Sequence, residues 1–156
     1  MVPELATSFE HHTAELAACY RELATLEGEL GWWQEAADHL GAAAQLAPDV
    51  PRYALEQAWA LFQATGELSE AVSIAEIVAE SDPQAVDPVL LLADMYLAAG
   101  RGQKALEWGQ VAVTAAPQSA DAWVRLARAY WLLDRQGEAQ QALAEPQIEW
   151  LVAPND

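Results

Sequence analysis

The sequence has few basic residues, and this shortage bears directly on the partners it can bind. Seven Lys and Arg stand against 24 Asp and Glu, which gives a formal net charge of −17. Such a surface repels phosphate backbones and anionic headgroups, because their binding depends on Lys and Arg. We therefore expect no nucleic-acid partner. Residues 1–51 hold nine acids and one base; this excess either steers a basic protein partner or only maintains solubility.

Cysteine and long apolar runs are also scarce. Cys19 is the single cysteine, so no internal disulfide can form, and we interpret it as a core residue. No run approaches the roughly 20 apolar residues that cross a bilayer, which predicts a soluble protein without membrane insertion. The start, MVPELATSFE, lacks the basic and apolar regions of a secretory signal. We therefore expect a cytoplasmic protein, and its 53% hydrophobic residues predict a packed core.

Catalytic motifs are missing as well. The sequence contains no Gly-rich phosphate loop, no G-x-S-x-G, no C-x-x-C and no H-E-x-x-H. His11 and Glu15 lie four residues apart with His12 beside them, but this is too small a ligand set for a metal. His39 is expected to form an ordinary surface pair with Glu35. We expect no catalytic residue, no metal and no cofactor, and therefore a protein that is not an enzyme.

What the sequence does have is an internal repeat. A small residue recurs at a nearly constant interval, at Ala36, Ala71, Ala105 and Ala139. A turn residue precedes each of them, at Gly31, Gly66, Gly100 and Asp134. A proline follows each of the first three alanines at the same offset, at Pro48, Pro83 and Pro117. Each unit has room for two helices of about 13 residues, or about 20 Å, which must pair and then stack to bury their apolar faces.

This pattern resembles the tetratricopeptide repeat, a pair of antiparallel helices with a W..LG..Y…A…F..A….P signature. The third unit carries the matching letters Val89, Leu92, Ala93, Tyr96, Gly100, Ala105, Ala112 and Pro117. The fourth carries Trp123, Leu126, Ala127, Tyr130 and Ala139. The resemblance implies an all-α fold, an α-α superhelix or solenoid of about four helix-turn-helix repeats with a C-terminal capping segment. It implies one domain over residues 1–156, with repeats at 17–51, 52–85, 86–119 and 120–146.

The two ends of the array need separate treatment, because terminal repeats expose a face that their neighbours bury. Apolar residues recur every seventh position at Phe9, Leu16, Leu23 and Leu30, and TSFE has capping-box spacing. These features predict a helical extension over residues 7–16 and a first helix of about 22 residues.

At the other end, Pro146 should truncate the last helix near Ala144, leaving a tail at residues 147–156. The tail contains Ile148, Trp150 and Leu151. It either folds over the last repeat or inserts into a groove of a second molecule. Two further glycines, Gly41 and Gly109, fall inside second helices, where we expect close helix contact to explain them.

The resemblance also implies a concave groove lined by the first helix of each repeat. Its expected lining is Arg21, Thr25, Tyr53, Glu56, Ala60, Gln63, Asp87, Leu90, Asp94, Leu97, Asp121, Val124, Arg128 and Trp131. Within this set the four apolar residues of the second half form a strip bordered by three aspartates. Such a strip suits a peptide or helix with apolar and basic residues. The strip could instead be covered by the array itself or by the tail.

Two functions follow from this reasoning. The first is a scaffold or adaptor that binds a segment of another protein in the groove. The alternative is a structural module that self-associates into a homo-oligomer through its terminal repeats and tail.

Overall fold

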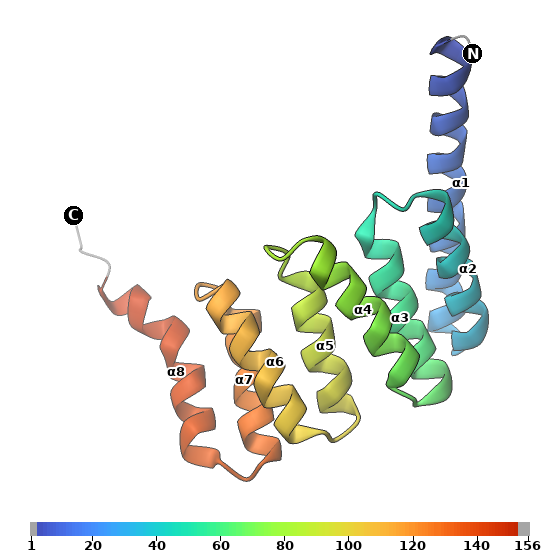
Figure 1. The fold of residues 1–156 in the computed structure, drawn as a ribbon. Coiled ribbons are helices and arrows are strands. Elements are labelled where there is room, and N and C mark those ends of the chain that lie inside the picture. The colour runs from blue at the N-terminus through green and yellow to red at the C-terminus, as the bar shows by residue number, and fades with distance from the viewer. Residues whose placement is uncertain (1–2, 153–156) are drawn as a thin grey trace. The chain divides into compact units, whose positions relative to one another are not determined.

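The computed structural model describes the backbone of residues 3–152 and the side chains of residues 6–145. This part of the chain contains eight helices and no strand, which confirms the all-α prediction (Figure 1). The helices are α1 (Pro3–Glu29), α2 (Trp33–Leu46), α3 (Pro51–Thr65), α4 (Ser69–Ser81), α5 (Asp87–Ala98), α6 (Gly102–Ala115), α7 (Ala120–Leu132) and α8 (Gln136–Val152).

The four predicted turns separate the two helices of each pair. All four turn residues have positive φ: 80° at Gly31, 71° at Gly66, 70° at Gly100 and 60° at Asp134. Glycine adopts this left-handed conformation without steric cost, and aspartate tolerates it better than most residues. The turn at Gly100 closes with a 2.8 Å hydrogen bond from the Arg101 amide to the Tyr96 carbonyl, which satisfies a carbonyl at the end of α5.

The predicted stops and crossing points also agree with the structure. Helices α2, α4 and α6 each end two residues before a proline, because the residue before a proline is displaced from the α region. The four recurring alanines are each at most 2% exposed. A side chain of one methyl group lets two helix backbones approach closely.

The chain divides into two compact units, Met1–Val78 and Ala79–Asp156. In the first unit, α2 packs between α1 and α3 over two alanine-rich clusters. In the second unit, α5, α6, α7 and α8 pack in chain order, and α5 also contacts α7. Leu92 and Met95 are the largest aliphatic side chains that are fully buried, and both lie on α5.

Both ends of the chain differ from the prediction. Helix α1 begins at Pro3 and has 27 residues, because proline is accepted in the first turn of a helix. Helix α8 continues through Pro146 to Val152 instead of ending near Ala144. Proline removes one helical hydrogen bond and crowds the carbonyl four residues earlier, but a helix can tolerate this with a kink. The expectation of a non-helical tail is therefore wrong as far as Val152.

Two predictions about α1 and α2 are also wrong. Cys19 is exposed rather than buried. His39 donates from Nδ1 to Oε2 of Glu27 across 2.8 Å, not to Glu35. Glu27 is 7% exposed, and the Tyr20 ring stacks on His39 with centroids 5.7 Å apart. The pairing of α1 with α2 thus brings together side chains from two different helices, which spacing within one helix does not predict.

Candidate functional site

In the second unit, one face of α7 carries four of the predicted groove residues. Asp121, Val124, Arg128 and Trp131 recur at helical spacing, and the structure places them on this one helix. Val124 is 41% exposed and Trp131 is 62% exposed. Trp131 therefore leaves most of its indole in water, which is uncommon for a side chain of this size.

The predicted partners on α5 are less accessible than expected. Leu90 is half-buried against the cluster of Val89, Ala112 and Ala122, and Leu97 is half-buried against a second cluster. Asp87 is exposed at the first turn of α5. The exposed part of the apolar strip predicted from sequence is therefore on α7, whereas its two leucines on α5 are half-buried.

The carboxylate of Asp94 already forms an ion pair with Arg125, a residue that was not among the predicted groove residues. Arg125 on α7 donates from Nη2 to Oδ2 of Asp94 across 2.7 Å, and from Nη1 to the Asp121 carbonyl across 3.0 Å. The Arg125 and Asp94 side chains are 22% and 25% exposed. The available signal was their separation in sequence, which is close to one repeat and places the pair on neighbouring first helices.

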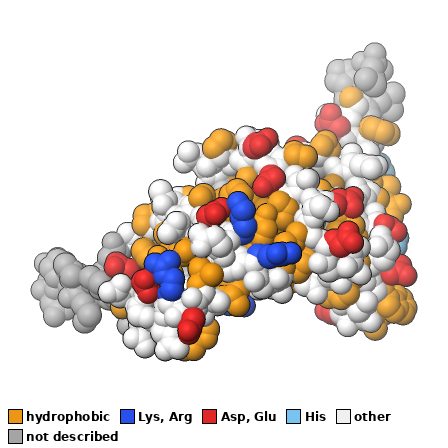
Figure 2. Space-filling model, turned by 60° about the horizontal axis from the view of Figure 1, so that its bottom comes forward, with side chains coloured by type: hydrophobic (Ala, Val, Ile, Leu, Met, Phe, Trp, Pro, Cys, Tyr) orange, Lys and Arg blue, Asp and Glu red, His pale blue; other side chains and the backbone are white. Residues whose placement is uncertain are grey.

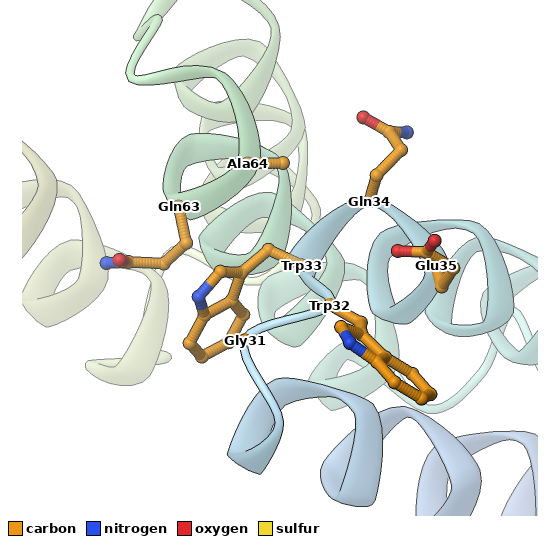
Figure 3. Close-up of a pocket in the computed structure, with 7 residues that line it drawn as sticks. All are labelled: Gly31, Trp32, Trp33, Gln34, Glu35, Gln63 and Ala64. Carbon is orange, nitrogen blue, oxygen red and sulfur yellow. The ribbon is translucent and has the colours of Figure 1, made fainter.

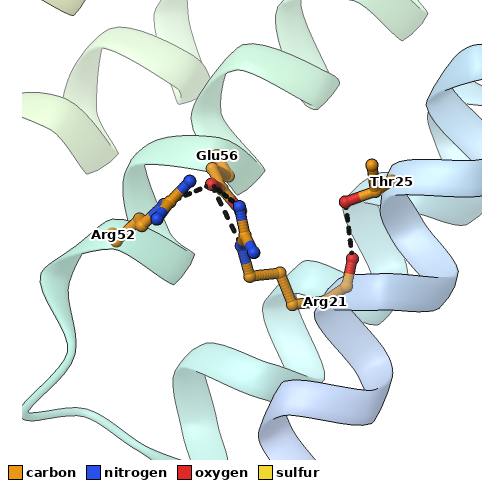
Figure 4. Close-up of polar contacts among 4 residues, drawn as sticks. All are labelled: Arg21, Thr25, Arg52 and Glu56. Atoms are coloured by element: carbon orange, nitrogen blue, oxygen red, sulfur yellow. Dashed lines mark hydrogen bonds and ion pairs between the residues drawn. The ribbon is translucent and has the colours of Figure 1, made fainter.

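In the first unit, the predicted groove residues meet in an ion cluster, drawn in Figure 4. Arg21 on α1 donates to both carboxylate oxygens of Glu56 on α3, at 2.8 to 3.1 Å. Arg52 donates to Oε1 of the same carboxylate at 2.7 Å. Thr25 instead donates its hydroxyl to the Arg21 carbonyl at 3.0 Å. Two arginines thus surround one carboxylate, so this acid is not available to a basic partner.

The cluster shifts the pKa of two of its members, Glu56 and Arg21. Burial raises the pKa of Glu56, but hydrogen bonds from Arg21 and Arg52 outweigh burial and hold that pKa below its usual value. The hydrogen bond to Glu56 raises the pKa of Arg21. Both shifts favour the ionised forms of Glu56 and Arg21, whose ion pair connects α1 with α3.

The remaining predicted groove residues of this unit are also on α3. Tyr53 is half-buried against the cluster of Ala17, Ala43 and Ala47. Ala60 is 2% exposed and belongs to the α1–α2–α3 core. Gln63 is exposed. The structure thus places the predicted residues in two sets, one in each unit.

A hollow of about 350 Å³ lies beside Gln63 and is shown in Figure 3. Its wall is formed by the turn before α2, the first turn of α2 and the end of α3, with Gly31, Trp32, Trp33, Gln34, Glu35, Gln63 and Ala64. The Trp33 ring extends toward Gln63, whereas Trp32 lies on the other side of the turn (Figure 3). Trp33 also packs against the core of this unit.

Basic side chains on the surface are few and mostly lie beside acids, as Figure 2 shows for one face of the molecule. Besides the pairs above, Lys104 bonds Glu107 and Arg135 bonds Glu138, both at 2.8 Å. Arg128 is exposed, and no ion pair is found for it among the described side chains.

The remaining candidate groups are placed as follows. Nε2 of His11 lies 3.1 Å from Oε1 of Glu15, whereas Nδ1 of His12 bonds the Ser8 carbonyl. The two imidazole rings therefore do not converge on one ligand position. The described side chains contain no cluster of three or more His, Cys, Asp or Glu with the geometry of a metal site.

None of the described helices combines the length and apolar content of a membrane-spanning segment. The side chains of Ile148, Trp150 and Leu151 lie outside the described residues.

Solved structures share this fold at low sequence identity. A thermophilic tetratricopeptide repeat protein, TTC0263 of Thermus thermophilus, has a TM-score of 0.70 at 17% identity, covering 85% of this chain and 73% of that one. MamA 41-end from Desulfovibrio magneticus RS-1 has a TM-score of 0.65 at 24% identity, covering 85% and 76%. MamA MSR-1 has a TM-score of 0.64 at 17% identity, covering 88% and 79%.

No curated protein matches the sequence significantly. The sequence profile of the tetratricopeptide repeat does match, over residues 21–86 and 64–120, which together span more than half of the chain. The predicted α-α superhelical repeat class is therefore confirmed. The chain belongs to the tetratricopeptide repeat family, whose fold serves generally as a scaffold for protein interactions.

Proposed function

We propose that this protein is a scaffold or adaptor that binds a segment of another protein on the exposed face of α7. The observation that carries the proposal is the exposure of Val124 and Trp131 at helical spacing on one face. Aromatic side chains supply a large contact area at a small entropic cost, and they are enriched among residues that dominate binding. The fold has the generally non-catalytic character of its family, which supports binding rather than chemistry.

The charges around this face define the partner. Asp94 is paired with Arg125, and Nη1 of the same arginine lies 4.0 Å from Oδ1 of the exposed Asp121. Among the described aspartates of this set, Asp87 is therefore the carboxylate open to a basic group. Arg128 stands between Val124 and Trp131 in sequence and offers one site for an acid. We therefore propose a peptide or helix with apolar anchors and basic residues, held to the face by Trp131.

The proposal is tested by site-specific cross-linking in cells. A photoreactive amino acid at position 131 should form a cross-link to a distinct partner. The same amino acid at position 111 is the control, because Val111 is also exposed, at 46%, but lies on α6. The identified partner is then titrated against purified variants.

Truncation of the contact residues gives the quantitative test. Trp131→Ala should weaken binding by about tenfold or more, and Val124→Ala should weaken it less, because a smaller apolar area is lost. Val111→Ala is the matched control for Val124→Ala and should leave affinity unchanged. Equal cross-linking at positions 131 and 111, or unaltered affinity of Trp131→Ala, would exclude the α7 face as the binding surface.

Self-association through the terminal repeats and Ile148, Trp150 and Leu151 stays a prediction. Sedimentation of the full chain against a chain ending at Glu145 addresses it. A monomer in both cases would remove this alternative.

A further inference from the structure

Helix α1 has a second apolar face that the first unit leaves uncovered. Its buried face contains Ala17, Ala24 and Glu27 and packs against α2. Apolar side chains nevertheless continue on the adjoining face of the helix. We call this surface the outer seam, and it consists of Phe9, Leu16, Cys19, Leu23, Leu26 and Leu30.

The exposure of the outer seam is large for residues of this type. Phe9 is 71% exposed, Leu26 is 58% and Leu30 is 63%; Leu16 and Leu23 are 46% and 42% exposed. Leucine and phenylalanine are normally among the more buried residues, and a contiguous apolar patch of this kind marks an interaction surface. The seam is about 32 Å long, since it spans about 21 residues at a rise of 1.5 Å each.

The spacing of the outer seam is that of a two-stranded helix pairing. Phe9, Leu16, Leu23 and Leu30 are seven residues apart, and Cys19 and Leu26 lie three residues after Leu16 and Leu23. This is the alternation of three and four residues by which one helix packs along another. None of these side chains belongs to the two buried clusters of the first unit, so much of their apolar surface is left for a contact outside the unit.

Three carboxylates follow the same repeat along one border of the seam. Glu15, Glu22 and Glu29 are all exposed and are also seven residues apart. Each lies three residues after a member of the row formed by His12, Cys19 and Leu26, so the helix places them beside that row. We call these three residues the edge carboxylates.

A second copy of this chain would fit the outer seam poorly. In an antiparallel pair the edge carboxylates of the two copies would face each other. In a parallel pair they would face the positions of Thr13, Tyr20 and Glu27, and none of these is basic. Like charges across a helix interface cost stability, so the carboxylates select against self-pairing.

We propose that the outer seam binds an amphipathic helix of another protein, whose apolar stripe is bordered by Lys or Arg. Its apolar residues pack on Leu16, Leu23 and Leu26, and its basic residues pair with the edge carboxylates. This surface is on the first helix of the first unit, and it goes beyond the proposed binding at α7.

The test uses the full chain and a designed probe. The probe is a synthetic helix of about four heptads with Leu at both seam positions and Lys at both flanking positions. A matched peptide carries Glu in place of each Lys. The Lys peptide should bind saturably and more weakly as salt rises, whereas the Glu peptide should bind at least about tenfold more weakly.

Variants locate the binding on α1. Leu26→Ala should weaken the Lys peptide by about tenfold, and Glu22→Gln should weaken it less and reduce the salt dependence. Ile77→Ala is the matched control, because Ile77 is 66% exposed but lies on α4. The α7 face is proposed to take a segment of similar chemistry, so the titration is repeated in Trp131→Ala, where binding at α1 should persist and should still be weakened by Leu26→Ala.

Cys19 provides a readout that needs no variant. It is exposed and belongs to the seam, so saturating Lys peptide should slow its alkylation by iodoacetamide about tenfold or more. Three results would overturn the proposal: equal binding of the Lys and Glu peptides, unaltered affinity of Leu26→Ala, or loss of binding in Trp131→Ala. A dimer of the chain alone that mild oxidation locks through Cys19, and that Leu26→Ala dissolves, would also overturn it, because the seam would then be occupied by a second copy.

Discussion

Gly41 and Gly109 occupy similar places in two second helices, yet they should respond in opposite ways to alanine. A Cβ added at Gly109 on α6 would lie 3.1 Å from Cα of Leu126 and 3.4 Å from its backbone nitrogen. A Cβ added at Gly41 on α2 would meet the side-chain amide of Gln57 instead, with Nε2 at 2.7 Å. The obstacle is a helix backbone in one case and the flexible end of a half-exposed side chain in the other.

The change in the free energy of unfolding on each Gly→Ala substitution is the sum of two opposing contributions. Replacing glycine by alanine inside a helix stabilises it by about 1 kcal/mol. At Gly109, α7 would have to retreat by a few tenths of an ångström, although it also packs on α5 and α8. Overpacking of this kind costs about 1–3 kcal/mol, so Gly109→Ala should lower the free energy of unfolding by about 1 kcal/mol. Gly41→Ala should raise it by up to about 1 kcal/mol, because Gln57 can rotate away.

Urea unfolding followed by circular dichroism measures both variants against the unmodified protein. The transition midpoints should shift in opposite directions, with unchanged dependence on denaturant. A Gly109→Ala protein that is stabilised as much as Gly41→Ala would show that α6 and α7 do not approach as closely as described, and would refute the reasoning.

The remaining predictions concern charges and the thiol. Glu56→Gln should destabilise the protein by about 1 kcal/mol at pH 7, because two arginines lose their partner. The pKa of Glu56 is depressed on folding, so its contribution is present above the usual value of 4.5 and is lost as the pH falls through the folded pKa. The penalty of Glu56→Gln should therefore shrink in acid-titrated unfolding curves, and a constant penalty would contradict this. Asp94→Asn should cost about 2 kcal/mol in thermal or urea unfolding, because it strands the half-buried Arg125; adding Arg125→Met should recover part of the loss, and no recovery would argue against the pair. Cys19 should react with Ellman's reagent in the native protein within about tenfold of its rate in denaturant, and slower reaction would indicate that it is covered.

Local rules explain how much of the fold was predictable. Gly31, Gly66, Gly100 and Asp134 mark turns because few residues adopt positive φ, and this preference acts within a few residues of the chain. The stops before the prolines are equally local. The same turn residues and prolines recur in successive repeats, so the sequence predicts the helix pairs and their order without any knowledge of tertiary contacts.

The face of the helix on which a residue lies was harder to predict than the existence of the helix itself. Helix α1 is apolar on two faces, and spacing alone does not say which of them meets α2. Cys19 was therefore assigned to the core although it is exposed. The proline rule failed at Pro146 for a related reason, since the penalty for one interior proline is finite and α8 continues to Val152.

The candidate site was predictable in its helices but not in its pairings. The residues predicted to line a groove lie on the first helices of the pairs, among them α3, α5 and α7, because the register of the repeat sets their positions. The groove itself stays a prediction. The link between Arg21 and Glu56 and that between Arg125 and Asp94 were not predicted. The members of each pair are separated by about one repeat, so the period itself was the signal that pointed to them.

The sequence by itself determined the helices, their turns and their pairing, because turn conformation and helix length are set by neighbouring residues. Only the tertiary structure decided which carboxylates form ion pairs, how deeply Leu90 and Leu97 are buried in the second unit, and which apolar face of α1 remains exposed to solvent. Those outcomes depend on contacts with side chains of another helix, and the residues adjacent in sequence do not determine such contacts.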